Sequence, residues 1–327
     1  MVRRLGPGPV RSAGLRPAVS SVPSTVPPAL PDRVPVAACP LCGGREFTPV
    51  CRAAAHAVVR CAGCQLHLLN PQPSDAELVE IYHPHYSFFG AEPGAEACVS
   101  RVKQATAAHY LNLLAAAGVS GGSLLEIGCG DGDFLLQASR RNFPATGIDY
   151  SPHSCAKAQA KLGAAARIIC GEISAVADRR ESYDLCVACD VIEHVRQPAD
   201  FLQTLHGLLR PNGRLFIVTP DLDSLAAKLL RSRWPEFKAE HMYYYTPRTL
   251  RRQLAQAGFT DIRLLGGTKM LSVDYVTRHF ITYPVSGLTP VLRLLRALLP
   301  ASWGQYPWLI PAGGMIALAR KPGPVGH

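Results

Sequence analysis

The sequence predicts an α/β fold built on a doubly wound, mostly parallel sheet. From residue 123 onward, short apolar runs alternate with segments of helical periodicity, which is the pattern of strands joined by crossover helices. A cluster of alternate glycines follows the first apolar run, and Pro211-Asn212-Gly213 is a turn signal before a later strand. The expected elements are strand 123–127, helix 132–141, strand 145–149, helix 152–162, strand 166–170, strand 183–189, helix 198–209, strand 213–219, helix 247–257, strand 260–266 and a final strand within 312–327.

The residues before this core divide into a leader, a cysteine module and a helical segment. Residues 1–37 repeat Pro, Gly, Ser and Val without periodicity, so we expect a disordered leader. Residues 73–117 are expected to form a helical linker or lid before the core at 118–267. Ser74 and Glu77 have the spacing of a capping box, and Gly118 would end the last helix of this segment.

Two tyrosines fall within the helical segment. Tyr82 and Tyr86 either contribute to a lid over the core or serve packing only, and the sequence leaves both readings open.

Charge is distributed unevenly along the 327 residues. The formal net charge is +10, of which residues 1–37 carry +4 and residues 248–327 carry +8, which leaves −2 for residues 38–247. A nearly neutral core gives no strong nucleic-acid signal. The basic C-terminal region either meets an anionic surface or is a solvated face.

Eleven cysteines are present, and four of them form the pattern C-x2-C-x18-C-x2-C within residues 38–72. Paired knuckles of this spacing hold zinc in a closed, structural site made of four thiolates, so a zinc ribbon is expected there. The alternative is ordinary reduced thiols or a redox pair. Gln65 follows the second knuckle where glycine is usual, which predicts a slightly strained turn. The expected ligands are Cys39, Cys42, Cys61 and Cys64.

The remaining cysteines are scattered, several of them within apolar runs, as expected of buried thiols in a reducing compartment. The N-terminal segment lacks the apolar stretch of a secretory signal, and no run approaches the length of a membrane span. We therefore expect a cytoplasmic protein.

The segment Leu-Leu-Glu-Ile-Gly-Cys-Gly-Asp-Gly-Asp at 124–133 places glycines at 128, 130 and 132 after an apolar strand and Glu126. Glycine permits positive φ and close ligand approach, so this is a strand–loop–helix that cradles a ligand. The spacing is neither that of the dinucleotide fingerprint nor that of a phosphate loop.

This segment resembles motif I of the class I S-adenosylmethionine (SAM)-dependent methyltransferases, and the resemblance extends over about residues 120–265. It implies a Rossmann-like sheet of seven strands that binds SAM. It also implies that the glycine loop, with Gly128, Gly130 and Gly132, approaches the methionyl and ribose portions. The other implied contacts are Glu126 to the ammonium group, Asp149 to the ribose hydroxyls, Glu172 near the adenine amine and Asp190 at the methionyl moiety.

The cysteine module followed by Leu-His-Leu-Leu-Asn-Pro-Gln-Pro resembles a group of bacterial methyltransferases of the methyltransferase-23 type. Some members of this group methylate carbon atoms of nucleotide-linked deoxysugars. The segment that begins at Glu240-His241 resembles the acid/base segment of those enzymes, which implies His241 as base and Glu240 as its tuning partner. His194 is a rival base, and His241 could instead cap a helix or pack structurally.

A helical insertion is expected at 268–311. Val291–Leu299 is apolar, with two arginines on one helical face, and two tryptophans are nearby. Residues 288–311 could contact a membrane surface, whereas packing on the same chain or on a partner subunit is the commoner role of such a helix.

The sequence therefore favours a SAM-dependent methyltransferase with a structural zinc ion. Its acceptor would be a small molecule or a nucleotide-sugar or glycan-like compound, methylated on carbon or oxygen by in-line displacement. Two alternatives remain open: a nicotinamide-dependent oxidoreductase, and a non-catalytic SAM-sensing protein that binds partners through its zinc ribbon.

Overall fold

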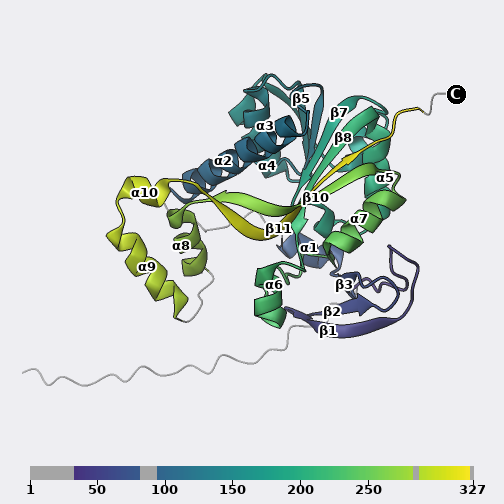
Figure 1. The fold of residues 1–327 in the computed structure, drawn as a ribbon, viewed down its shortest axis with the longest axis horizontal. Coiled ribbons are helices and arrows are strands. Elements are labelled where there is room, and N and C mark those ends of the chain that lie inside the picture. The colour runs from purple at the N-terminus through teal and green to yellow at the C-terminus, as the bar shows by residue number, and fades with distance from the viewer. Residues whose placement is uncertain (1–32, 82–93, 283–286, 325–327) are drawn as a thin grey trace, which may run out of the picture. The chain divides into compact units, whose positions relative to one another are not determined.

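A seven-stranded sheet forms the centre of the protein, and its strand order is β10-β11-β8-β7-β4-β5-β6 (Figure 1). The computed structural model describes residues 33–81, 94–282 and 287–324. Strand β11 is antiparallel to both of its neighbours, whereas β8, β7, β4, β5 and β6 are mutually parallel. This arrangement confirms the predicted fold class. The strands are β4 (Leu124–Ile127), β5 (Ala145–Asp149), β6 (Ala166–Cys170), β7 (Tyr183–Cys189), β8 (Leu209–Pro220), β10 (Thr260–Leu271) and β11 (Trp308–Arg320).

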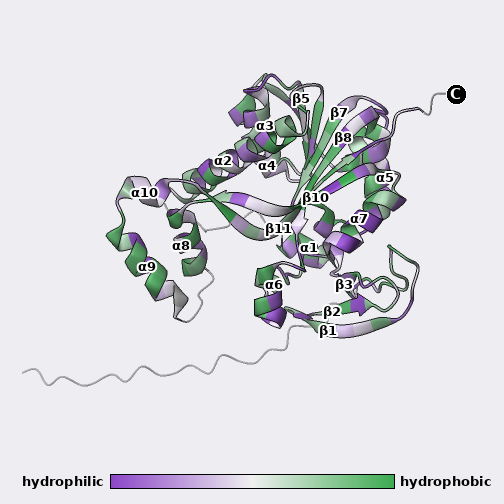
Figure 2. Cartoon of the chain, viewed as in Figure 1, coloured by the Kyte–Doolittle hydropathy of each residue, from purple (hydrophilic) through white to green (hydrophobic). Residues whose placement is uncertain are grey.

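Helices cover both faces of this sheet because successive strand side chains point to opposite sides. Leu124 packs in one apolar cluster with side chains of α2, α3 and α4, whereas Leu125 packs in another with side chains of α5 and α7. Figure 2 shows apolar residues along the central strands. These helices are α2 (Ala95–Ala116), α3 (Asp133–Ser139), α4 (Pro152–Leu162), α5 (Pro198–Leu208) and α7 (Pro247–Gln256).

The predicted turn at Pro211–Gly213 lies inside β8 rather than before it. Tyr183 of β7 pairs with Leu209, but Leu185 already pairs with Arg214, so the intervening residues form a bulge. Asn212 has a φ of 67°, the left-handed conformation that a Pro-Asn-Gly turn favours. The turn signal is therefore correct, and it interrupts a strand that begins earlier than expected.

The cysteine segment folds into a second sheet of order β1-β2-β3-β9, from β1 (Phe47–Ala53), β2 (His56–Cys61), β3 (His67–Leu69) and β9 (Tyr243–Tyr244). The fourth strand comes from a distant part of the chain. The Leu69 amide donates to the Met242 carbonyl at 3.0 Å, and Leu66 and Leu68 share an apolar cluster with Met242 and Tyr245. The cysteine sheet and the main sheet are thus joined through a common core.

Helix α1 (Asp75–Ile81) begins with the predicted capping box. The Ser74 amide donates to the Glu77 carboxylate at 2.9 Å, and the Glu77 amide donates to the Ser74 hydroxyl at 3.1 Å. Tyr82 and Tyr86, as well as the leader up to residue 32, lie outside the described residues.

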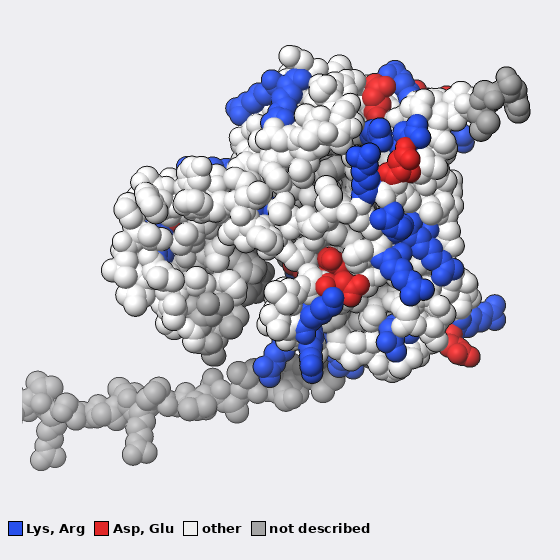
Figure 3. Space-filling view, viewed as in Figure 1, with Lys and Arg blue, Asp and Glu red and all other residues white. Residues whose placement is uncertain are grey.

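Strands β10 and β11 continue beyond the ends expected from the sequence, and the hairpin pairs up to Leu271 and Trp308. Three helices join them: α8 (Val273–Thr282), α9 (Leu288–Leu298) and α10 (Ala301–Gln305). Several apolar side chains of this region are exposed, among them Leu294 at 62% and Leu298 at 73%. The region around α9 carries little charge on the face drawn in Figure 3. Among the described residues, no helix combines the length and the apolar character needed to cross a membrane.

The remaining short helices are α6 (Leu225–Leu230) and the 3-10 turns η1 (Ile173–Val176), η2 (Ile192–His194) and η3 (Arg231–Arg233). Of these, η2 follows β7 directly and carries part of the site described next.

Candidate active site

The three glycines that follow β4 all adopt left-handed backbone conformations, but their surroundings differ. A Cβ atom at Gly128 (φ 70°) would lie 2.7 Å from Cγ2 of Val191, so the loop touches the segment after β7. Gly132 (φ 77°) packs closely on Ala158 and Leu162 of α4. Gly130 (φ 52°) faces open space. Two glycines therefore allow close packing, and the third leaves room for a ligand.

Asp149 ends the neighbouring strand β5 and fixes the shape of this loop. Its carboxylate accepts a hydrogen bond from the Gly130 amide at 2.8 Å and another from the Ser151 amide at 2.9 Å. A carboxylate offers about four acceptor positions, so two remain for the ribose hydroxyls that the resemblance implies as partners of Asp149. The same side chain can thus shape the loop and hold a nucleoside.

Glu126 points into the interior at the end of β4. It is 4% exposed, and its Oε2 atom has no hydrogen-bond partner among the described residues. Burial, followed by the nearby Asp149 carboxylate, raises the pKa of Glu126 well above its usual range. A buried, unpartnered carboxylate oxygen fits a ligand that brings its own ammonium group, as SAM does.

The two other predicted cofactor residues also lie at carboxyl ends of strands. Glu172 follows β6 and immediately precedes η1. Asp190 follows β7 with a φ of 54°, an uncommon conformation for a non-glycine residue, and its carboxylate pairs with the Lys269 ammonium at 2.7 Å. All predicted cofactor residues therefore converge on one edge of the sheet, where doubly wound folds bind ligands.

A second group of side chains meets beside this edge. Glu193, His194 and His241 bring a carboxylate oxygen and two imidazole nitrogens within 4.8 Å of one another. Glu193 and His194 belong to η2, only two and three residues beyond Val191, which touches the glycine loop. His241 arrives from the segment before β9. The group therefore lies next to the predicted cofactor loop.

Hydrogen bonds hold the two histidines in defined orientations. His194 Nδ1 lies 3.0 Å from the carbonyl oxygen of Glu240, and His241 Nδ1 lies 2.9 Å from that of Glu236. The rings meet edge to face, with centroids 4.7 Å apart. The Met242 amide donates to the Glu193 carbonyl at 2.7 Å, which ties the two segments together. Glu240, predicted to tune His241, contacts His194 through its backbone.

Burial dominates the electrostatics of this group. It lowers the pKa of His241 to about 2, with His194 and Lys238 acting in the same direction, and it also lowers the pKa of His194. Burial and then the Asp190 carboxylate raise the pKa of Glu193 to about 8. Both imidazoles are therefore neutral near pH 7, which differs from the poised base expected at His241.

The four predicted zinc ligands lie together: Cys39 and Cys42 precede β1, Cys61 ends β2, and Cys64 follows in the turn before β3. Their sulfur atoms are all within 4.8 Å of one another, with Cys39–Cys64 and Cys42–Cys61 each separated by 3.5 Å. Tetrahedral zinc thiolate sites require sulfur atoms about 3.8 Å apart, since Zn–S bonds are about 2.3 Å long. The donor set and its spacing therefore fit zinc.

The knuckle glycine and its counterpart behave as the sequence predicts. Gly43 has a φ of 73° and Gln65 a φ of 68°, so both knuckles need a left-handed residue. The Gln65 side-chain amide donates to the Ala62 carbonyl at 2.9 Å. That bond compensates in part for the strain of a side chain at this position.

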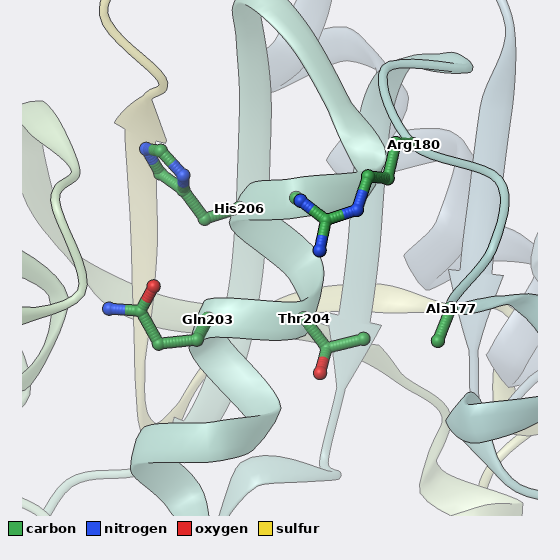
Figure 4. A pocket seen from close by; sticks show the side chains of 6 residues that line it. Ala177, Arg180, Gln203, Thr204 and His206 are labelled. Carbon is green, nitrogen blue, oxygen red and sulfur yellow. The ribbon is translucent and has the colours of Figure 1, made fainter.

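A separate hollow of about 360 Å³ lies near the amino ends of β7 and β8, away from the carboxyl ends that carry the predicted site (Figure 4). It lies between the C-terminal half of α5 and the segment that leads into β7, and Arg180, Thr204 and His206 are among its lining residues. None of the predicted site residues contributes to it.

Sequence reasoning did not assign a role to Glu193 or Lys269. Glu193 had a signal, because Asp190-Val-Ile-Glu193-His194 follows an apolar strand and places three polar groups at its end. Lys269 had none, because only the extension of β10 brings it to Asp190.

Comparison with known proteins places these residues in a family. Residues 100–264, half of the chain, match a family model described as a methyltransferase domain. A ubiquinone biosynthesis O-methyltransferase of Aeromonas salmonicida is 30% identical over 153 residues, which are 43% of this chain and 64% of that protein. The mitochondrial enzyme of the same name from Schizosaccharomyces pombe is 34% identical over 119 residues, 34% of this chain and 42% of that protein. The chain thus spans less than two thirds of the length of either relative.

Among solved structures, a SAM-dependent methyltransferase from Thermotoga maritima aligns with a TM-score of 0.46 and 15% identity over 68% of this chain and 91% of that one. A second solved structure aligns with a TM-score of 0.48 and 17% identity, over 76% of this chain and 94% of that one. Its description is the conversion of a disulfide bond into a thioacetal group during echinomycin biosynthesis. The family match decides against the nicotinamide-dependent alternative. The chain belongs to the methyltransferase-domain family and is a SAM-dependent methyltransferase.

Proposed function

We propose that this enzyme transfers the methyl group of SAM to a hydroxyl oxygen of a small molecule. Two of its relatives are named as O-methyltransferases of ubiquinone biosynthesis, which supports oxygen as the acceptor atom. The observation that carries the proposal is the position of the Glu193–His194–His241 group, directly beside the glycine loop through the contact of Gly128 with Val191.

On the donor side, SAM supplies an electrophilic methyl group when it is bound. We assign Asp149 to the ribose hydroxyls, Glu126 to the ammonium group and Glu172 to the adenine side, and the glycine loop to the backbone contacts. Asp190 borders the methionyl portion, and its pairing with Lys269 keeps its carboxylate in place. Each assignment is the one that the resemblance to class I methyltransferases implies, and the position of these side chains at the carboxyl ends of the strands supports it.

On the acceptor side, we assign His194 and His241 to holding the acceptor hydroxyl rather than to storing its proton. His241 is buried and His194 is half-buried, both are neutral, and their Nδ1 atoms face backbone carbonyls. The carbonyl of Glu240 orients His194. A fixed hydroxyl in line with the sulfur–methyl bond supplies the proximity on which such a displacement depends.

The Cys39–Cys42–Cys61–Cys64 group is proposed to bind one structural zinc ion. Four thiolates close the coordination sphere, so this metal would stabilise the fold and take no part in chemistry. Its effect would reach the active site through β9, which pairs with β3 and directly follows Met242.

A methyl-transfer assay tests the proposal. The enzyme is incubated with isotope-labelled SAM and hydroxyl-bearing compounds, including phenols and nucleotide-linked sugars, and the products are identified by mass spectrometry and NMR. We expect methyl ethers, and we expect His241→Ala to reduce turnover by about 100-fold or more, as removal of a positioned group at a reacting atom does. S-adenosylhomocysteine should still bind.

His206→Gln is the matched control, because His206 lies at the opposite hollow. Methylation of a sugar carbon would contradict a hydroxyl oxygen as the acceptor. Undiminished turnover by His241→Ala would show that His241 does not hold the acceptor.

Contact of residues 288–311 with a membrane surface stays a prediction. The exposed apolar side chains of α9 and the exposed Trp303 and Trp308 support it.

A further inference from the structure

We propose that Glu193, His194 and His241 bind a divalent metal ion that holds the acceptor hydroxyl. This site is separate from the four cysteines, and the inference rests on the proposed function because the ion would act on the acceptor oxygen. One carboxylate and two imidazoles form the ligand set of facial metal sites, which leave positions open for a substrate.

Backbone carbonyls fix the tautomer of both histidines in a form that can bind a metal through Nε2. Their Nδ1 atoms lie 3.0 and 2.9 Å from backbone carbonyl oxygens, and a carbonyl oxygen can only accept a hydrogen bond. Nδ1 therefore carries the proton in each ring, and Nε2 carries the lone pair. Metal-binding histidines are typically oriented in this manner by a partner at the other ring nitrogen.

Glu193 supplies the carboxylate ligand, from which a bound cation would displace the proton. Glu193 is 1% exposed, and its Oε2 atom accepts a hydrogen bond from the Thr219 hydroxyl at 3.0 Å. Oε1 is buried and has no hydrogen-bond partner among the described residues. An unsatisfied carboxylate oxygen at such a position is costly unless it meets a cation. A metal ion between this oxygen and the two imidazoles would satisfy it.

Two lysines near this site are each paired with a carboxylate. The Lys238 ammonium pairs with the Glu236 carboxylate at 3.0 Å, and the Lys269 ammonium pairs with Asp190 at 2.7 Å. The two lysines are thus held by acidic partners of their own and do not occupy the Glu193 carboxylate.

Such an ion would explain how a site with two neutral histidines can activate a hydroxyl. Coordination lowers the pKa of a bound hydroxyl, so its O–H bond breaks and the proton passes to solvent water. The oxygen then forms the new O–CH3 bond while the S–CH3 bond breaks and its electron pair stays on sulfur. The products are the methyl ether, S-adenosylhomocysteine and one released proton.

Manganese binding tests the site without SAM or an acceptor. Purified full-length protein is freed of weakly held metal with a chelator, and one cysteine-bound zinc per chain is verified by elemental analysis. Mn²⁺ is then titrated, and the free ion is followed by electron paramagnetic resonance. Mn²⁺ prefers nitrogen and oxygen ligands over thiolates, so it reports on this site. We expect one Mn²⁺ per chain, and an affinity at least about 10-fold weaker in Glu193→Gln and in His241→Ala.

Glu181→Gln and His206→Gln are the matched controls, since both positions lie away from this site, and they should bind Mn²⁺ like the native protein. If His241→Ala fails to fold, Glu193→Gln decides, because it preserves shape and removes only the charge. Absence of Mn²⁺ binding by native protein, or equal binding by Glu193→Gln, would overturn the inference.

A failure of this inference is distinguishable from a failure of the proposed function. Methyl transfer at full rate by protein that holds only the cysteine-bound zinc would leave the function standing and reject the second metal. Tight Mn²⁺ binding without any methyl ether product would leave the metal site standing and reject the proposed function.

Discussion

Replacement of Cys39 by serine is expected to abolish zinc binding and to lower both stability and methyl transfer. A structural zinc site contributes its binding free energy to folding, so its loss should reduce Tm by about 10 °C or more, given that each kcal/mol shifts Tm by about 2–4 °C in a domain of this size. Methyl transfer should fall further than binding of S-adenosylhomocysteine, because the cysteine sheet includes β9, next to His241.

The measurement combines elemental analysis, thermal unfolding and the two functional assays. Cys98→Ser is the matched control, since Cys98 lies on α2 outside the four-sulfur group. A Cys39→Ser protein without zinc that unfolds at the native temperature would contradict a structural role for the metal.

Gly128→Ala is expected to weaken binding of S-adenosylhomocysteine by about 30-fold or more. An alanine would have to adopt a φ of 70°, and its Cβ atom would lie 2.7 Å from Val191 Cγ2. A left-handed alanine costs about 1–2 kcal/mol and the clash adds to it, and each 1.4 kcal/mol is about tenfold in binding when the bound loop bears the strain. Calorimetric titration measures the change.

Two further variants separate the causes of this effect. Gly121→Ala, where a Cβ would meet nothing within 4 Å, should bind like the native protein. Adding Val191→Ala to Gly128→Ala should restore part of the affinity by relieving the clash but not the backbone strain. Native affinity in Gly128→Ala would show that the loop does not shape the cofactor site.

The core of the fold was predictable because its signals are local. The run Leu-Leu-Glu-Ile before the glycines, the Asp149 strand end and the Ser74–Glu77 capping box each depend on residues a few positions apart. The four cysteines were predictable for the same reason, since two knuckles of fixed spacing can share one metal. These features appear in the structure where the sequence places them.

The acceptor side was less predictable because it is assembled by distant contacts. His241 meets Glu193 and His194 only because the Met242 amide bonds to Glu193 and β9 joins the cysteine sheet. The sequence identified His241 and His194 as chemically interesting, but it could not give their burial. That burial lowers the pKa of His241 to about 2 and changes its assigned role from base to ligand of the acceptor or of a metal ion.

SAM is proposed to bind between the glycine loop and Asp149, and calorimetric titration with S-adenosylhomocysteine tests this binding most directly. We expect one molecule to bind per chain, with at least about 10-fold weaker binding in Asp149→Ala, because its carboxylate accepts from the Gly130 amide and is proposed to hold the ribose. Asp200→Ala, an exposed carboxylate on α5, should leave binding unchanged. A folded, zinc-loaded native protein that does not bind S-adenosylhomocysteine would contradict the account.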